Sequence, residues 1–186
     1  TCLLALSVCF LRAEVKMPAV FGDNMVLQQQ SEVAIWGWAK ARTTVKVTTS
    51  WNDKGYSAKA DQEGYWKVMV KTPAASFTPY KVTVSDGKKI TFNNVLIGEV
   101  WVCSGQSNMA MPMKGYLGQP VEGASEYIMT ARPESPIRLC NVREKFSFEP
   151  MDTCGAAWHE HTPEGVAESS ATAYFFARTL YEALCI

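Results

Sequence analysis

The expected fold is decided by one stretch in the middle of the chain, Gly98-Glu99-Val100-Trp101-Val102-Cys103-Ser104-Gly105-Gln106-Ser107-Asn108-Met109. The apolar run from Val100 to Cys103 predicts a short buried strand, and the small residues that follow it predict a turn. Ser107 then lies just beyond the carboxyl end of this strand, where open α/β sheets bind their ligands. We therefore expect Ser107 to be a nucleophile, with Gln106 and Asn108 as candidates for the substrate pocket.

The serine motif differs from the nucleophile elbow of the α/β-hydrolases, Gly-x-Ser-x-Gly. Position 109 is Met, and the glycine lies two residues before the serine. A single serine after a buried strand is most often only a turn residue. Further motifs are therefore needed before Ser107 is assigned a catalytic role.

Such motifs are present on both sides of the serine. The segment from Trp101 to Met109 resembles the first conserved block of the SGNH hydrolases, in the variant form Gly-Gln-Ser-Asn-Met of the sialate O-acetylesterases and related carbohydrate acetylesterases. Other segments resemble the same family, namely Phe21-Gly22-Asp23-Asn24-Met25-Val26-Leu27-Gln28 upstream, and Trp158, Thr162-Pro163-Glu164, Ser170-Ala171 and Tyr174-Phe175-Phe176-Ala177-Arg178 downstream. The resemblance implies a serine esterase that removes O-acetyl groups from sugars.

The resemblance also implies roles for individual residues. Ser107 would be the nucleophile, and its own backbone N–H would donate to the oxyanion. The family carries its base histidine in an Asp-x-x-His motif near the end of the domain, and this sequence contains no such motif. We therefore expect these residues to be inactive alone. The expected substrate is an O-acetylated sugar or glycan, with sialic acids favoured and acetylated xylan as the alternative.

The two histidines, His159 and His161, are the only candidates for a base within the sequence. Neither completes an Asp-x-x-His motif, because position 156 is Ala and position 158 is Trp. Triads form in space and in any chain order, so either histidine stays open as a less favoured base. A His-x-His pair also suits a metal on a strand edge, but only Glu160 accompanies it, and a solvated loop is favoured.

The region from residue 33 to residue 93 predicts short strands with one buried face, because apolar residues such as Val45 and Val47 alternate with polar ones. Turn signals separate the strands at Asn52-Asp53-Lys54-Gly55, Asp61-Gln62-Glu63-Gly64 and Asp86-Gly87, the last a hairpin candidate. This pattern predicts a β-sandwich domain over residues 14–94. Its tryptophans would either stack on a glycan or pack in the core, and core packing is favoured for the set Trp36, Trp38, Trp51 and Trp66.

After residue 95 the pattern changes to alternating strands and helices. Ser107 starts a Met-rich stretch that opens a helix and is interrupted by Pro112. Residues 122–131 predict a short helix, residues 136–142 a second buried strand, and residues 168–184 an amphipathic helix capped by Ser169 or Ser170. Residues 95–186 therefore predict the first, incomplete part of a three-layer α/β domain of flavodoxin-like, SGNH hydrolase type.

Both ends of the sequence carry apolar stretches. Leu3 to Leu11 is too short to span a bilayer and suits the core of a secretory signal, so residues 1–13 are expected to be a partial signal peptide. This predicts a secreted, periplasmic or lysosomal protein with no membrane insertion of the mature chain. At the other end Leu184-Cys185-Ile186 is apolar. We expect the sequence to be an amino-terminal fragment.

Composition restricts the partners. Eighteen basic and eighteen acidic residues cancel, so no footprint for nucleic acid is present. No nucleotide-binding glycine motif and no Cys-x-x-Cys pair occurs, so neither a cofactor nor a zinc site is expected. Cys2 and Cys9 fall in the expected signal, and Cys103 is expected to be a small core residue. Disulfide pairing among Cys140, Cys154 and Cys185 is left open.

Two classes of function are thus carried forward. The first is a serine esterase acting on O-acetylated sugars, with Ser107 as its nucleophile. The second is a non-enzymatic glycan-binding or accessory β-sandwich protein, in which the hydrolase domain is vestigial. A Gly-Gly-Thr block and an Asp-x-x-His motif downstream of Ile186 would favour the first.

Overall fold

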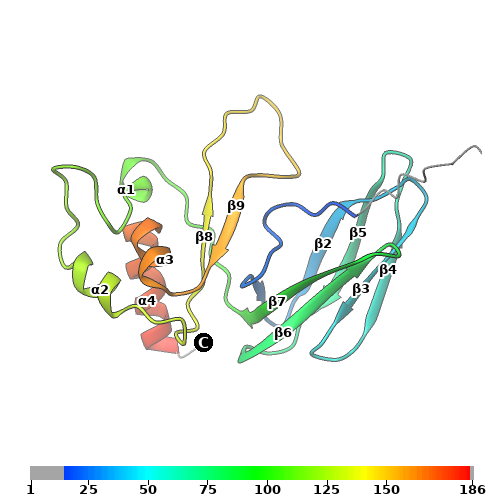
Figure 1. Cartoon of the computed structure of the whole chain (residues 1–186), viewed down its shortest axis with the longest axis horizontal. Helices are drawn as coiled ribbons and strands as arrows, with labels where there is room; N and C mark the ends of the chain where they lie inside the picture. The colour runs from blue at the N-terminus through cyan, green and yellow to red at the C-terminus, as the bar shows by residue number, and fades with distance from the viewer. Residues whose placement is uncertain (1–14, 185–186) are drawn as a thin grey trace, which may run out of the picture.

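The computed structural model describes residues 15–184. The expected signal segment, residues 1–13 with Cys2 and Cys9, lies outside the described residues, as does Cys185. Strands β1 to β7 form one side of the molecule, helices α1 to α4 gather on the other side, and the β8–β9 hairpin lies between them (Figure 1). No helix within the described range is long and apolar enough to cross a membrane.

From residue 15 to residue 98 the chain forms seven strands, as its alternating pattern predicts. They are β1 (Val26–Gln28), β2 (Glu32–Trp38), β3 (Thr44–Thr49), β4 (Gly55–Lys59), β5 (Tyr65–Lys71), β6 (Ser76–Ser85) and β7 (Lys89–Gly98). Five of them form one sheet in the order β1-β7-β6-β3-β4, while β2 and β5 pair separately. The sheet is mixed, because β1 runs parallel to β7 whereas the other pairs are antiparallel.

The two sheets share one hydrophobic core. Val45 of β3 and Val82 of β6 are fully buried, and they belong to the same cluster as Ile35 of β2 and Trp66 of β5. The prediction of core packing is confirmed for Trp66, which is 1% exposed. Trp36 and Trp51 are half-buried against the same cluster. Trp38 packs edge-on against Tyr65.

The predicted turns connect these strands. Asp86-Gly87 lies between β6 and β7, where Ser85 pairs with Lys89, so the hairpin prediction is confirmed. In the turn between β4 and β5, Gly64 adopts φ +87, a left-handed conformation that favours glycine. Residues whose backbone preferences favour turns, such as these glycines, thus set where the strands end in this half of the chain.

In the second half, the residues described up to Leu184 form four helices and one hairpin. They are α1 (Ser107–Ala110), α2 (Ala124–Thr130), β8 (Leu139–Val142), β9 (Ala156–His159), α3 (Pro163–Glu168) and α4 (Ala171–Leu184). Helix α2 confirms the short helix expected over residues 122–131. Helix α4 confirms the amphipathic helix, although its start differs, because Glu168 ends α3 and Ser169 is the C-terminal cap of α3. The N–H of Ala173 donates to Ser170 Oγ at 3.3 Å, so Ser170 caps α4.

The expected strand Val100–Cys103 is wrong in this structure. The segment is not a strand, and the side chains of Trp101 and Val102 are 58% and 92% exposed. Cys103 is exposed as well, so it is not a core residue. No strand within residues 15–184 pairs with this segment, so it lacks the inter-strand backbone hydrogen bonds that would make it part of a sheet.

The second expected strand is present as β8, but it does not join a parallel sheet. It pairs antiparallel with β9, and Val142 at its end is exposed. A separate core cluster fills this half, with Met113, Leu139, Val166 and Tyr174 among its buried members. The β-sandwich and SGNH classes, and the change of architecture expected near residue 95, therefore remain predictions.

Candidate functional site

The three predicted site residues lie together on the surface. Ser107 is the first residue of α1, Gln106 is its N-terminal cap, and Asn108 follows within the helix; all three are exposed. The carbonyl of Gln106 accepts from the N–H groups of Met109 and Ala110, both at 2.9 Å. The Ser107 hydroxyl makes no hydrogen bond to any part of residues 15–184, so it is available to a substrate.

Helix α1 is short for reasons that the sequence contains. Its four residues end at Ala110, and Met111 takes extended backbone angles of φ −61 and ψ 113. This is the conformation expected of a residue that precedes a proline, here Pro112. The prediction of a helix that opens at Ser107 and is interrupted by Pro112 is therefore confirmed.

The segment that leads into the serine turn is fixed at its start by two amide side chains, from Gln28 at the end of β1 and from Gln29 directly after it. The carboxylate of Glu99 accepts from Gln29 Nε2 at 2.8 Å and from Gln28 Nε2 at 3.0 Å. The N–H of Val100 donates to Gln28 Oε1 at 2.9 Å. These donors, first Gln29 and then Gln28, lower the pKa of Glu99 because they favour the charged carboxylate. The extended segment is thereby tied to the five-stranded sheet before it reaches Ser107.

An apolar groove of about 810 Å³ lies beside the serine turn. Its walls come from the extended segment 100–105, from β8 and from the apolar face of α4. Trp101 and Phe176 meet edge-to-face across part of it, with ring centroids 5.3 Å apart. Ser104 and Gly105 line the groove, whereas Ser107 does not. The nucleophile candidate thus lies next to the groove and outside its lining.

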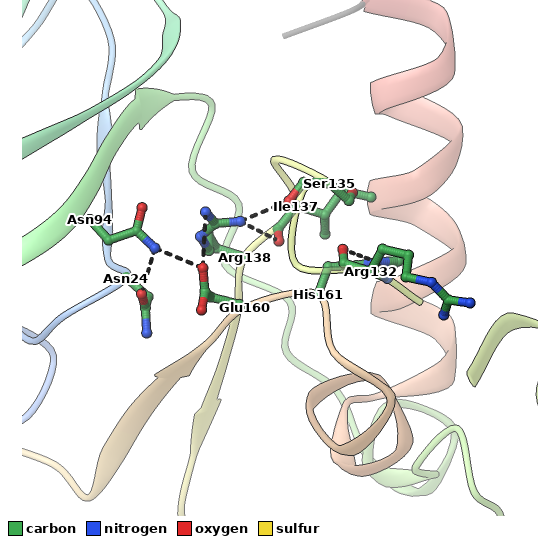
Figure 2. Close-up of polar contacts among 8 residues, drawn as sticks. All are labelled: Asn24, Asn94, Arg132, Ser135, Ile137, Arg138, Glu160 and His161. Carbon is green, nitrogen blue, oxygen red and sulfur yellow. Dashed lines mark hydrogen bonds and ion pairs between the residues drawn. The ribbon is translucent and has the colours of Figure 1, made fainter. Parts of the chain in front are cut away.

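Neither histidine forms a hydrogen bond to Ser107 among residues 15–184. His159 is exposed on β9, while His161 is buried with its Nε2 2.9 Å from the Tyr174 hydroxyl. Its other ring nitrogen, Nδ1, lies 3.3 Å from the backbone N–H and 3.3 Å from the carbonyl of Arg132 (Figure 2). The prediction of a solvated loop is wrong for His161, because α4 supplies a buried tyrosine partner that spacing alone does not reveal.

The environment of His161 favours its neutral form. Burial is the main cause that lowers the pKa of His161, and the nearby charges of Arg178 and Arg138 lower it further. The carbonyl of Arg132 acts in the opposite direction and only partly offsets these effects. His161 is therefore a structural link between Arg132 and Tyr174 rather than a free base.

This arrangement predicts that His161 makes stability depend on pH. The unfolded histidine takes up a proton near its ordinary pKa of 6.5, whereas the folded one takes it up only at lower pH. The free energy of unfolding is therefore highest above about pH 6.5 and decreases as the pH falls below that value. Urea unfolding at pH 7.5, 6.5 and 5.5 should show a loss of up to about 1.4 kcal/mol per pH unit from this group. His161→Gln should remove that part of the slope. His159→Gln, which changes an exposed histidine, should keep it, and equal slopes in wild type and His161→Gln would contradict the prediction.

A second polar cluster joins the two halves of the molecule. Asn94 of β7 donates through Nδ2 to Asn24 Oδ1 and to Glu160 Oε1, both at 2.8 Å (Figure 2). The same Glu160 oxygen lies 3.7 Å from a guanidinium nitrogen of Arg138, whose side chain is only 5% exposed. Burial lowers the pKa of Arg138 and the Glu160 carboxylate opposes that effect. Glu160, which the sequence offered only as a companion of the histidines, is thus a contact between sheet and hairpin.

Arg138 completes this cluster from the loop that precedes β8. Its Nη1 donates to the carbonyls of Ser135 and Ile137 at 2.8 and 3.2 Å (Figure 2). Its Nε is buried without a hydrogen-bond partner. Sequence reasoning did not single out Arg138, and its position within an apolar strand pattern was the one signal of burial.

Metal ligands and thiols add no further site. Among residues 15–184, no group of three or more His, Cys, Asp or Glu residues is placed to hold a metal. Cys103, Cys140 and Cys154 are free thiols. Burial, followed by the nearby Cys154, raises the pKa of Cys140 to about 11, so this thiol stays protonated at neutral pH. The pairing left open between Cys140, Cys154 and Cys185 is not tested, because Cys185 lies outside the described range.

Comparison with known proteins gives the chain clear relatives. No protein-family model matches it. Sialate O-acetylesterase of Homo sapiens is 29% identical over 188 residues, which cover 91% of this chain and 35% of the human protein. Sialate O-acetylesterase of Rattus norvegicus is 29% identical over 185 residues, which cover 89% of this chain and 33% of that protein. The chain spans about a third of the length of the curated relatives it matches.

A solved structure agrees with these relatives. A carbohydrate acetylesterase from Xanthomonas citri superposes with a TM-score of 0.82 at 28% identity, covering 92% of this chain and 38% of that one. The resemblance to sialate O-acetylesterases and related carbohydrate acetylesterases, expected from the motif around Ser107, is therefore confirmed.

Proposed function

We propose that this chain carries the nucleophile of a serine esterase that releases acetate from O-acetylated sugars. The observation that supports it most is the position of Ser107, which is exposed at the start of α1 with a hydroxyl that has no hydrogen-bond partner among residues 15–184. The relatives are sialate O-acetylesterases and a carbohydrate acetylesterase, which supports acetyl esters of sugars as the substrate class.

The proposed reaction is acyl transfer in two steps. Ser107 Oγ attacks the acetyl carbonyl carbon while a base takes its proton, and the sugar hydroxyl leaves with a proton returned by that base. Water then hydrolyses the acetyl-serine to acetate and free serine. The first N–H groups of a helix have no partner within it, so the Ser107 N–H is available to the oxyanion. Gln106 and Asn108 flank the serine and would contact the sugar.

The base is proposed to lie outside this chain. Neither histidine contacts Ser107, and His161 is engaged by Tyr174. We infer that the Asp-x-x-His motif and the remaining oxyanion donors belong to polypeptide beyond residues 1–186. We also propose that residues 14–94 are a β-sandwich domain, that residues 95–186 are the incomplete SGNH-type domain, and that the protein is secreted, periplasmic or lysosomal.

The substrate preference is tested in the longer protein that carries the base. Acetate release should be faster from O-acetylated sialic acid than from acetylated xylan at equal ester concentration, because the curated relatives are sialate O-acetylesterases. The measurement is acetate formed per minute, with the Ser107→Ala variant as the blank. A faster rate on xylan would contradict the preference for sialic acids and leave the esterase proposal standing.

The second candidate is a non-enzymatic glycan-binding or accessory protein. It is favoured by one observation, that no base is placed beside Ser107 within the described residues. It predicts glycan binding with no Ser107-dependent acetate release, even when the reading frame is extended past Ile186. A downstream Asp-x-x-His motif would argue against this candidate.

A further inference from the structure

Helix α1, which carries Ser107, has little stability of its own. It contains four residues, none of them buried, and Gln106 supplies no side-chain cap. Isolated helices shorter than about 12 residues are marginal in water even when their composition is favourable. The position of the Ser107 hydroxyl must therefore be fixed by contacts from outside α1.

Those contacts come from the junction between α3 and α4. This junction, Ser169 to Thr172, contains two buried residues, Ser169 and Ala171, so it is itself firmly packed. Two of its side chains bond to the α1 turn: Thr172 Oγ1 donates to the Asn108 carbonyl at 3.1 Å, and Ser170 Oγ donates to Met109 Sδ at 3.3 Å. Two backbone bonds join the residues that follow α1: the Ala171 N–H donates to the Met111 carbonyl, and the Met113 N–H donates to the Ser169 carbonyl, both at 2.8 Å.

The bond from Thr172 is the one closest to the nucleophile. The Asn108 carbonyl belongs to the last turn of α1, where the helix has no N–H left to donate to it. The Thr172 hydroxyl donates to this carbonyl instead. Asn108 directly follows Ser107, and holding its carbonyl fixes the planar peptide between Asn108 and Met109 within the α1 turn. We propose that Thr172 is a positioning residue for Ser107. This inference rests on the proposed function for its catalytic meaning.

The same helix offers a matched control. Thr179 of α4 is also exposed, but its Oγ1 donates to the carbonyl of Phe175 at 2.9 Å, within the helix. Thr179→Val removes the same hydroxyl from the same helix without touching α1. Thr172→Ser keeps the hydroxyl of Thr172 and removes only a methyl group.

The first experiment measures hydrogen exchange at the amides of Met109, Ala110 and Met111, which are the hydrogen-bonded amides of α1. In residues 14–186, Thr172→Val should speed their exchange about fivefold, as expected for the loss of one hydrogen bond worth about 1 kcal/mol. Thr172→Ser should stay within about twofold of wild type. Thr179→Val should leave the exchange of these amides unchanged. All variants should keep the wild-type free energy of unfolding within about 1 kcal/mol, so that global unfolding does not account for the difference.

The second experiment measures acetate release in the longer protein that carries the base. Thr172→Val should lower kcat about tenfold or more with little change in KM, because a misplaced nucleophile affects the reaction more than binding. Thr172→Ser should restore kcat.

The outcomes separate this inference from the proposed function. Unchanged exchange at the three amides in Thr172→Val would overturn it, as would faster exchange with an unchanged kcat. If wild type shows no Ser107-dependent turnover at all, the proposed function fails. In that case the exchange data alone decide whether Thr172 holds the α1 turn.

Discussion

Replacing Ser107 with Ala is expected to abolish acetate release in the longer protein that we propose above as the source of the base. Removal of the nucleophile of a serine hydrolase costs at least about 10⁴-fold in kcat, since the remaining groups only bind substrate and stabilise the oxyanion. The structure makes this variant a clean test. The side chain of Ser107 is exposed and its hydroxyl has no partner in the described part of the chain, so Ala should change stability by less than about 0.5 kcal/mol.

Ser104 provides the matched control for this result. It is an exposed serine three positions before Ser107, in the extended segment that leads into α1, and it lines the groove that Ser107 does not line. Ser104→Ala should retain most of the activity, and a serine-directed phosphonate should label Ser107. Loss of activity in Ser104→Ala with activity retained in Ser107→Ala, or labelling at Ser104, would contradict the assignment of the nucleophile.

Features of the fold that depend on neighbouring residues could be predicted from the sequence. The alternation of Val45 and Val47 with polar residues placed both side chains in the core, and Asp86-Gly87 marked the β6–β7 hairpin. The amphipathic spacing in α4 identified the helix, and of the two predicted caps, Ser169 and Ser170, the structure has Ser170. Each of these signals arises from conformational preferences within a few residues, so a single sequence contains them.

Features that depend on distant partners could not be predicted. The apolar run Val100–Cys103 carries the composition of a buried strand, yet burial needs a second strand, and none in residues 15–184 pairs with it. Likewise β8 was expected, but its antiparallel pairing with β9 depends on residues further along the chain. Hydrophobic pattern gives the type of an element and leaves its partner undetermined.

The candidate site shows the same division. Ser107, Gln106 and Asn108 were predicted together, and they lie together, because they are consecutive. The contacts that surround them join residues far apart in sequence, such as Thr172 to Asn108 and Tyr174 to His161. A hydroxyl or a ring nitrogen has many possible partners, and only the folded chain selects one.

These residues alone are expected to show no Ser107-dependent hydrolysis. A serine hydroxyl is a weak nucleophile at its own pKa, and a positioned base typically contributes about 10² to 10⁴ in rate. The structure offers no such base: His161 is buried against Tyr174 with its Nδ1 beside the Arg132 backbone, and His159 is exposed on β9. Neither forms a hydrogen bond to Ser107 within residues 15–184.

The measurement compares residues 14–186 with their Ser107→Ala variant on p-nitrophenyl acetate, and the two rates should be equal. Added imidazole serves as a control, because it supplies a free base. A small increase in the hydrolysis rate of wild type over Ser107→Ala would show that the serine is correctly folded and lacks only a base. His159→Gln and His161→Gln should leave the rate of residues 14–186 unchanged, because neither histidine reaches the serine. A turnover that depends on Ser107 and disappears in one of these variants would overturn the prediction and identify that histidine as the base.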